Sequence, residues 1–160
     1  MKRLQHAVRN ILFPNVRCLS CDEPRAIDPG SPLCDACAEE LNTLLLGDGV
    51  CPRCRCFMPK QGPCMFCAEG HLPGLVGSWA PFRYHSVTQR LVVRLKFGGV
   101  HLAAQPLIEG MIHSMPSSGF DALVPMSLHK NRLRERGFDQ ALLLARGIAQ
   151  ASGLPLMQAL

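Results

Sequence analysis

Residues 18–67 read CLSCDEPRAIDPGSPLCDACAEELNTLLLGDGVCPRCRCFMPKQGPCMFC, and this stretch decides how the first part of the chain folds. It contains all nine cysteines of the 160-residue chain. Eight of them form four CxxC pairs, separated by 12, 13 and 9 residues: Cys18/Cys21, Cys34/Cys37, Cys51/Cys54 and Cys64/Cys67. Each pair makes a turn that presents two sulfurs to one metal ion, so four pairs predict two tetrahedral zinc sites.

The pairing that uses the least chain assigns the first two CxxC units to one ion and the last two to the other, and an interleaved arrangement stays open. The segments between the pairs are rich in Pro, Gly and Asp, so metal binding, worth on the order of 10 kcal/mol, should supply most of the stability. Four thiolates leave no position for water or substrate, which indicates structural zinc. Cys56 is the odd thiol, either a spare cysteine or a substitute ligand.

The amino-terminal residues bear on the alternatives to zinc, which are disulfides and redox-active CxxC pairs. Polar residues interrupt the first 13 positions, so no apolar run of the length of a signal peptide or membrane span occurs there. The sequence therefore predicts a cytoplasmic protein without stable membrane insertion, in a reducing compartment that favours zinc. Residues 3–13 predict an amphipathic helix that docks onto the zinc module, with a membrane surface as the alternative.

Charge divides unevenly along the chain. Residues 1–70 carry eight Lys and Arg against eight Asp and Glu, and residues 71–160 carry nine against four, so the whole net charge of +5 belongs to the second part. This asymmetry favours an anionic partner for the second part. The cysteines end at Cys67, and we expect a boundary near Gly70, with one unit over 1–70 and another over 75–160.

The second part has the pattern of an α/β fold. The expected elements are strand, helix, helix, strand and helix, at 78–84, 86–97, 101–113, 121–125 and 140–151. Ser86 is expected to cap the first helix, and Gly98 and Gly153 to follow helix ends. Pro106 sits inside the second helix unless that helix begins near Gln105. Residues 121–125 are continuously apolar, as in a buried parallel strand.

A cationic segment, residues 128–140, follows that strand at its carboxyl end, where open α/β sheets place their ligands. Four of seven consecutive positions are basic: Lys130, Arg132, Arg134 and Arg136. Arginine suits phosphate because its planar fork binds two oxygens at once, although a solvated helix face with Glu135 offsetting its neighbours is an equally good interpretation. His129 is expected to pack or cap there. Lys96 could contribute to this anion site from a neighbouring helix end or serve only as a C-cap.

Three stretches together carry a family resemblance: Leu12-Phe13-Pro14 before the first CxxC pair, Leu95-Lys96-Phe97, and above all RLRERGFDQ at 132–140. With the paired zinc knuckles, they resemble the competence protein F (ComF) family over nearly the whole chain. Departures are mild: Met126 and Ser127 replace the usual Val-Pro, and Asp139 stands where asparagine is usual.

The resemblance implies a double zinc ribbon followed by a type I phosphoribosyltransferase-like parallel-sheet domain. It also implies a part in natural transformation, in which bacteria take up external DNA, with single-stranded DNA or proteins of the competence machinery as partners. The candidate phosphate- or DNA-binding residues are then Lys96, Lys130, Arg132, Arg134 and Arg136.

The resemblance also implies a phosphoribosyl pyrophosphate loop, in which two acidic residues precede a Thr- and Gly-rich turn, and this chain has no such motif. We therefore expect an incomplete sheet, a carboxy-terminal truncation, and binding of a phosphoribosyl pyrophosphate-like ligand only by a full-length form. No catalytic residue is assigned. The alternatives are a phosphoribosyltransferase for a small base, inactive in this chain, and a zinc-ribbon module for protein interaction.

Overall fold

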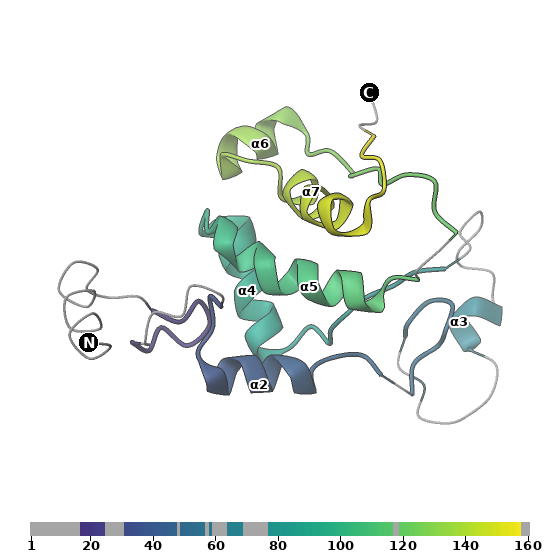
Figure 1. Cartoon of the computed structure of the whole chain (residues 1–160), viewed down its shortest axis with the longest axis horizontal. Helices are drawn as coiled ribbons and strands as arrows, with labels where there is room; N and C mark the ends of the chain where they lie inside the picture. Colours follow the sequence, from purple (N-terminus) through teal and green to yellow (C-terminus); the bar gives the residue numbers. More distant parts are fainter. Residues whose placement is uncertain are drawn as a thin grey trace.

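Helices make up most of the regular structure in the computed structural model, which describes residues 17–24, 31–47, 49–56, 58, 64–68, 77–116 and 119–157. In chain order they are α2 (Asp35–Thr43), α3 (Met65–Ala68), α4 (Ser86–Phe97), the 3-10 turn η1 (His101–Ala103), α5 (Ala104–Ser114), α6 (Lys130–Arg136) and α7 (Gln140–Ser152) (Figure 1). No helix in the described ranges is long and apolar enough to cross a membrane. The helix expected at 3–13 lies outside these ranges.

The helix predicted at 86–97 is confirmed as α4, with Val87, Leu91 and Leu95 buried along one face. Its expected cap is wrong, because the residue in the N-cap position is His85. The Ser86 hydroxyl instead donates a hydrogen bond to the Glu40 carboxylate on α2. The Ser86 side chain, which the sequence pattern assigns to the cap of α4, therefore binds α2 instead.

The other two predicted helices are also present, with small shifts at their ends. α5 begins at Ala104, so Pro106 is its third residue, in the first turn, where a backbone N–H has no partner inside the helix. α7 runs to Ser152, and Gly153 is its C-cap. The φ of Gly153, 75°, is the left-handed conformation that favours glycine.

Only isolated strand contacts occur in the described residues, so the parallel sheet of the α/β prediction is not found there. Leu45 pairs antiparallel with Phe82, and Leu123 pairs parallel with Leu156. The parallel contact uses both backbone groups of Leu123, which donates to the Pro155 carbonyl at 2.9 Å and accepts from Met157 at 2.9 Å.

Two prolines explain why the parallel contact stops at one bridge. In this register the next N–H on one side would come from Pro125, and on the other side from Pro155. Neither residue has an N–H to donate. The strand predicted at 121–125 is therefore reduced to a single bridge, although its parallel direction relative to residues 154–156 is as the α/β pattern requires.

One hydrophobic core joins the cysteine-rich part to the helices that follow it. Its members from the first part are Cys18, Leu33, Cys37, Leu41 and Leu44, and those from the second part are Val87, Leu91, Leu95, Ala103, Ala104 and Leu107. Polar contacts reinforce the junction: Arg90 donates to the Ser20 hydroxyl at 2.8 Å, and Arg94 forms an ion pair with Asp22. The predicted boundary at Gly70 itself lies outside the described residues.

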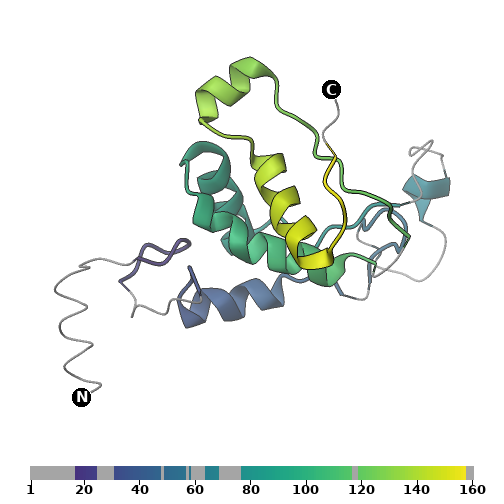
Figure 2. The same ribbon diagram turned by 45° about the horizontal axis from the view of Figure 1, so that its top comes forward.

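α7 packs along α5, whereas α6 projects from the body of the molecule (Figures 1 and 2). Gly147 on α7 allows the close approach, because a Cβ there would lie 2.4 Å from the Ile108 side chain on α5. No residue of α6 is buried. The helix with the highest density of positive charge thus places no residue in the core.

Candidate metal centres and cationic helix

The first cysteine cluster consists of Cys18, Cys21, Cys34 and Cys37, whose sulfurs all lie within 4.8 Å of one another. A tight turn presents the first pair, closed by a hydrogen bond from the Cys18 N–H to the Glu23 carbonyl at 3.0 Å. The second pair begins α2, with Cys34 in the N-cap position. Backbone N–H groups of Ser20 and Cys34 point at the Cys18 sulfur, at 3.3 and 3.4 Å. Such donors stabilise a thiolate ligand.

The second cluster repeats this plan with Cys51, Cys54, Cys64 and Cys67, whose sulfurs also lie within 4.8 Å of one another. Its first pair is again a turn, and its second pair begins the short helix α3. The residue after each turn pair has a positive φ, 64° at Asp22 and 59° at Arg55. The two knuckles therefore have the same backbone bend, and the chain contains one structural unit twice.

The sulfur geometry fits zinc in both clusters. Four ligands at about 2.3 Å from a tetrahedral ion lie about 3.8 Å from one another. The observed separations are 3.8 Å for Cys21–Cys34, 3.7 Å for Cys51–Cys67 and 3.6 Å for Cys54–Cys64. The clusters are thus compatible with two zinc ions, and the local grouping of the pairs is confirmed over the interleaved one.

The thiols of each cluster differ in how readily they lose their protons. Burial opposes ionisation of Cys18, but three backbone N–H groups lower its pKa to about 6. A backbone N–H of Cys67 is the main cause that lowers the pKa of Cys64 to about 6. Burial raises the pKa of Cys37 and of Cys67 to about 12. Zinc binding at neutral pH must therefore expel protons, so metal affinity should fall on acidification.

Helix α6 carries four of the five predicted anion-binding residues: Lys130, Arg132, Arg134 and Arg136. His129 caps its start, as expected, with Nδ1 accepting a hydrogen bond from the Asn131 N–H at 3.4 Å. Gly137, with φ of 78°, ends the helix. Arg132 and Glu135 form an exposed ion pair at 3.5 Å. No acidic side chain of the described residues pairs with Lys130 or Arg134.

Arg136 differs from the other basic residues of α6, because its side chain is turned inward. Its Nη1 donates to the Gln140 side chain at 3.0 Å, and its guanidinium carbon lies 5.5 Å from the centre of the Phe97 ring. That ring is 69% exposed at the end of α4. Lys96, the fifth predicted residue, precedes Phe97 and is exposed. The ends of α4 and α6 therefore meet, as the prediction for Lys96 requires.

Sequence reasoning missed two features that hold this cationic edge in place. Asp139 accepts hydrogen bonds from Leu142 at 3.0 Å and from Leu128 at 3.1 Å, so it caps α7 and ties down the segment before α6. The Phe138 ring packs against that of His101, with ring centres 4.0 Å apart and the ring planes tilted by 52°. An aspartate directly before an apolar helical run is a recognisable cap signal. The ring contact is tertiary and has no local signal.

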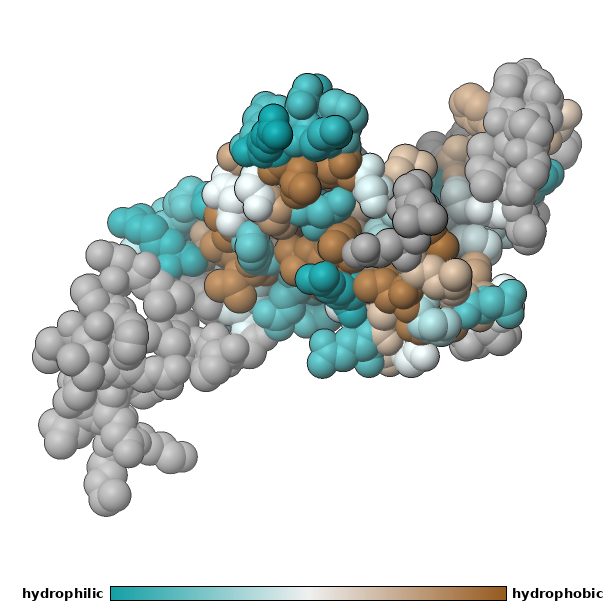
Figure 3. Space-filling model, turned by 90° about the horizontal axis from the view of Figure 1, so that it is seen from above, coloured by the Kyte–Doolittle hydropathy of each residue, from teal (hydrophilic) through white to brown (hydrophobic). Residues whose placement is uncertain are grey.

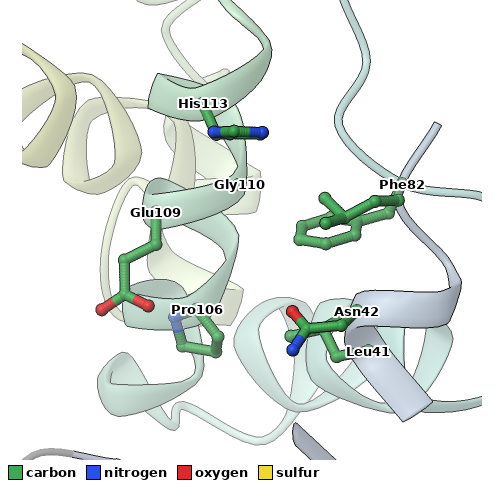
Figure 4. Close-up of a pocket in the computed structure, with 8 residues that line it drawn as sticks. Leu41, Asn42, Phe82, Pro106, Glu109, Gly110 and His113 are labelled. Atoms are coloured by element: carbon green, nitrogen blue, oxygen red, sulfur yellow. The ribbon is translucent and has the colours of Figure 1, made fainter. Parts of the chain in front are cut away.

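A cavity of about 310 Å³ lies between the end of α2 and α5. Figure 4 shows the Phe82 ring facing Gly110, with Glu109 and His113 along α5 and Asn42 at the end of α2. The ring fits there because a Cβ on Gly110 would lie 2.2 Å from it. None of the residues predicted to bind metal or phosphate lines this cavity.

Comparisons with protein-family models, curated proteins and solved structures gave no match to this chain.

Proposed function

We propose that this protein binds single-stranded DNA through α6 and the adjoining end of α4, in the manner expected of a ComF-like competence protein. Its two zinc ions serve to hold the fold. In this proposal Arg132, Arg134 and Lys130 contact phosphates, and Lys96 extends the positive surface. The observation that carries it is the exposed cationic helix beside an exposed aromatic ring.

The charge of α6 is available to a ligand. Lys130 and Arg134 are exposed and have no acidic partner among the described residues, and the Arg132–Glu135 pair is more than half exposed at both ends. Exposed ion pairs of this kind contribute about 0–1 kcal/mol, so a phosphate can compete for Arg132 at small cost. Hydrophilic residues gather where α6 projects in Figure 3, beside a band of hydrophobic ones.

The aromatic neighbour favours single strands over duplex. Proteins that bind single strands combine a positive groove with rings on which unpaired bases stack, and every base has a face that can do so. The Phe97 ring has Arg136 on one side and is 69% exposed. A base on Phe97 would leave the neighbouring phosphates within reach of the α6 arginines, because the two helix ends meet.

The parallel contact between Leu123 and Leu156 favours a second, finer proposal, that the helical part is a portion of a phosphoribosyltransferase-like domain. α6 and α7 connect the two parallel segments, and α6 follows the carboxyl end of the first. This is where such sheets place phosphate groups. The chain lacks an acidic pair with a Thr- and Gly-rich turn, so we expect no pyrophosphate release from phosphoribosyl pyrophosphate in its presence.

The binding proposal is tested by fluorescence anisotropy with a labelled oligonucleotide, single-stranded or duplex, over a range of salt concentrations. Arg134→Ala should weaken single-strand binding at least roughly threefold and lower the slope of log K against log salt by about 0.7, the value for one lost phosphate contact. Arg146→Ala is the matched control, because it removes one exposed arginine from a helix other than α6. Unchanged binding by an Arg132→Ala/Arg134→Ala variant would refute the proposal.

A further inference from the structure

The second zinc cluster contains a fifth thiol, and the first does not. The Cys56 sulfur lies 3.3 Å from that of Cys54 and 3.2 Å from that of Cys64. Both separations are shorter than the edge of about 3.8 Å between sulfurs that share a tetrahedral zinc. The first cluster has only its four cysteines, since all nine are accounted for. The two otherwise similar sites therefore differ by one thiol.

Cys56 is not a fifth ligand of the same ion. The four sulfurs that lie mutually within 4.8 Å are Cys51, Cys54, Cys64 and Cys67, a set that Cys56 does not join. Structural zinc sites are four-coordinate, so Cys56 could enter only by displacing a ligand. Its backbone is fixed beside the cluster, because its carbonyl accepts a hydrogen bond from the Cys51 N–H at 2.9 Å. The Cys56 thiol is thus held in contact with two sulfurs of a set that already supplies four ligands.

Of its two neighbours, Cys64 is the better partner for a covalent bond. Cys54 and Cys56 are separated by one residue, and a disulfide between them would close a small, strained ring. Cys64 lies eight positions further along the chain, at the closer sulfur–sulfur distance of 3.2 Å. A disulfide to Cys64 closes a loop of ordinary size and removes one zinc ligand.

We propose that Cys56 makes the second zinc site a redox-modification site: a hydroperoxide oxidises Cys56 and Cys64 to a disulfide, and the site releases its zinc. This inference is independent of DNA binding. In the first step the Cys56 sulfur, which lies outside the set of four ligands, attacks one oxygen of hydrogen peroxide. The O–O bond breaks, the departing hydroxide takes the Cys56 proton and leaves as water, and Cys56 becomes a sulfenic acid.

In the second step the Cys64 thiolate attacks the sulfenic sulfur of Cys56, so that an S–S bond forms and the S–O bond breaks. The hydroxide that departs in this step takes a proton from solvent. Two electrons pass from the two sulfurs to the peroxide. The three remaining thiolates are Cys51, Cys54 and Cys67, one short of a closed site.

The surroundings of the two sites allow the second to open alone. Cys18 and Cys37 belong to the core that contains α4, whereas no cysteine of the second cluster does. α3, which carries the Cys67 ligand, has no buried residue. Loss of zinc from the second site therefore need not disturb the packing around α4.

The experiment treats the two-zinc protein with hydrogen peroxide and follows zinc with a chromogenic chelator. Wild type should release one zinc per chain and carry a Cys56–Cys64 disulfide by peptide mass spectrometry. A thiol reductant with added zinc should restore the starting state. Cys56→Ser, which keeps all four ligands, should retain both zincs at the same peroxide dose.

Two outcomes would overturn the inference. One is zinc release from Cys56→Ser as fast as from wild type. The other needs no variant: a disulfide in oxidised wild type that maps to the first cluster, or to a pair without Cys56, would assign the reaction elsewhere. The first cluster thus acts as an internal control within the same molecule.

Discussion

Phe97 ends α4 with 69% of its surface exposed, although it is the kind of side chain that folding usually buries. Its one described ring contact is with the guanidinium of Arg136, at 5.5 Å. A cation above one face orients the ring and leaves the other free for stacking. This exposure is what the proposed stacking of a base on Phe97 requires.

Replacing Phe97 by leucine should weaken single-stranded DNA binding by roughly 5- to 150-fold, since stacking of one base on an aromatic ring contributes about 1–3 kcal/mol. Thermal stability should change little, because the ring is mostly exposed. Tyr84→Leu is the matched control: it removes another exposed aromatic, at 63%, near the opposite end of α4. Equal losses of affinity from both variants would mean that Phe97 has no special role.

At the scale of elements, Asp139 decides whether α6 is held in its place. One carboxylate oxygen caps α7 and the other binds the Leu128 N–H, so a single side chain connects the segment before α6 to the helix after it. Asp139→Ala should lower the free energy of unfolding by about 1 kcal/mol, the usual value for a lost cap. Chemical denaturation measures it.

Two variants separate capping from charge at this position. Asp139→Asn should retain most of the stability, because asparagine caps helices about as well as aspartate. Asp121→Ala removes an exposed aspartate outside any helix and should be close to neutral. If Asp139→Ala proves as mild as Asp121→Ala, the two hydrogen bonds do not hold the segment.

Elements with a periodic apolar face and a glycine stop could be predicted from the sequence, as α4 and α7 show. α2 could not, because its buried residues are Cys37 and Leu41, and the CxxC spacing of Cys37 indicates a metal ligand and not a core position. The predicted parallel sheet is represented in the described residues by a single bridge, because Pro125 and Pro155 interrupt a ladder whose register is not visible in the sequence. The cysteine grouping was predictable because its spacing is local, whereas the contact of Phe97 with Arg136 depends on tertiary packing.

For the whole molecule, the two zinc clusters play unequal parts in stability. Cys18 and Cys37 are at once candidate ligands of the first zinc site and members of the core, with 0% and 5% exposure. The first cluster therefore links metal binding to the packing of α2 against α4. The second cluster lies outside that core. Of its four cysteines only Cys51 is buried.

Cys37→Ser and Cys67→Ser should each lower the zinc content from two ions to one, with different consequences. Zinc binding worth on the order of 10 kcal/mol is comparable to the whole stability of a small domain. Loss of the first site should therefore unfold the common core, and α4 amides in Cys37→Ser should lose protection from hydrogen exchange. In Cys67→Ser those amides should stay protected while the second cluster opens locally, since α4 packs on residues of the first cluster. Equal loss of α4 protection in the two variants would show instead that both zincs support one cooperative unit.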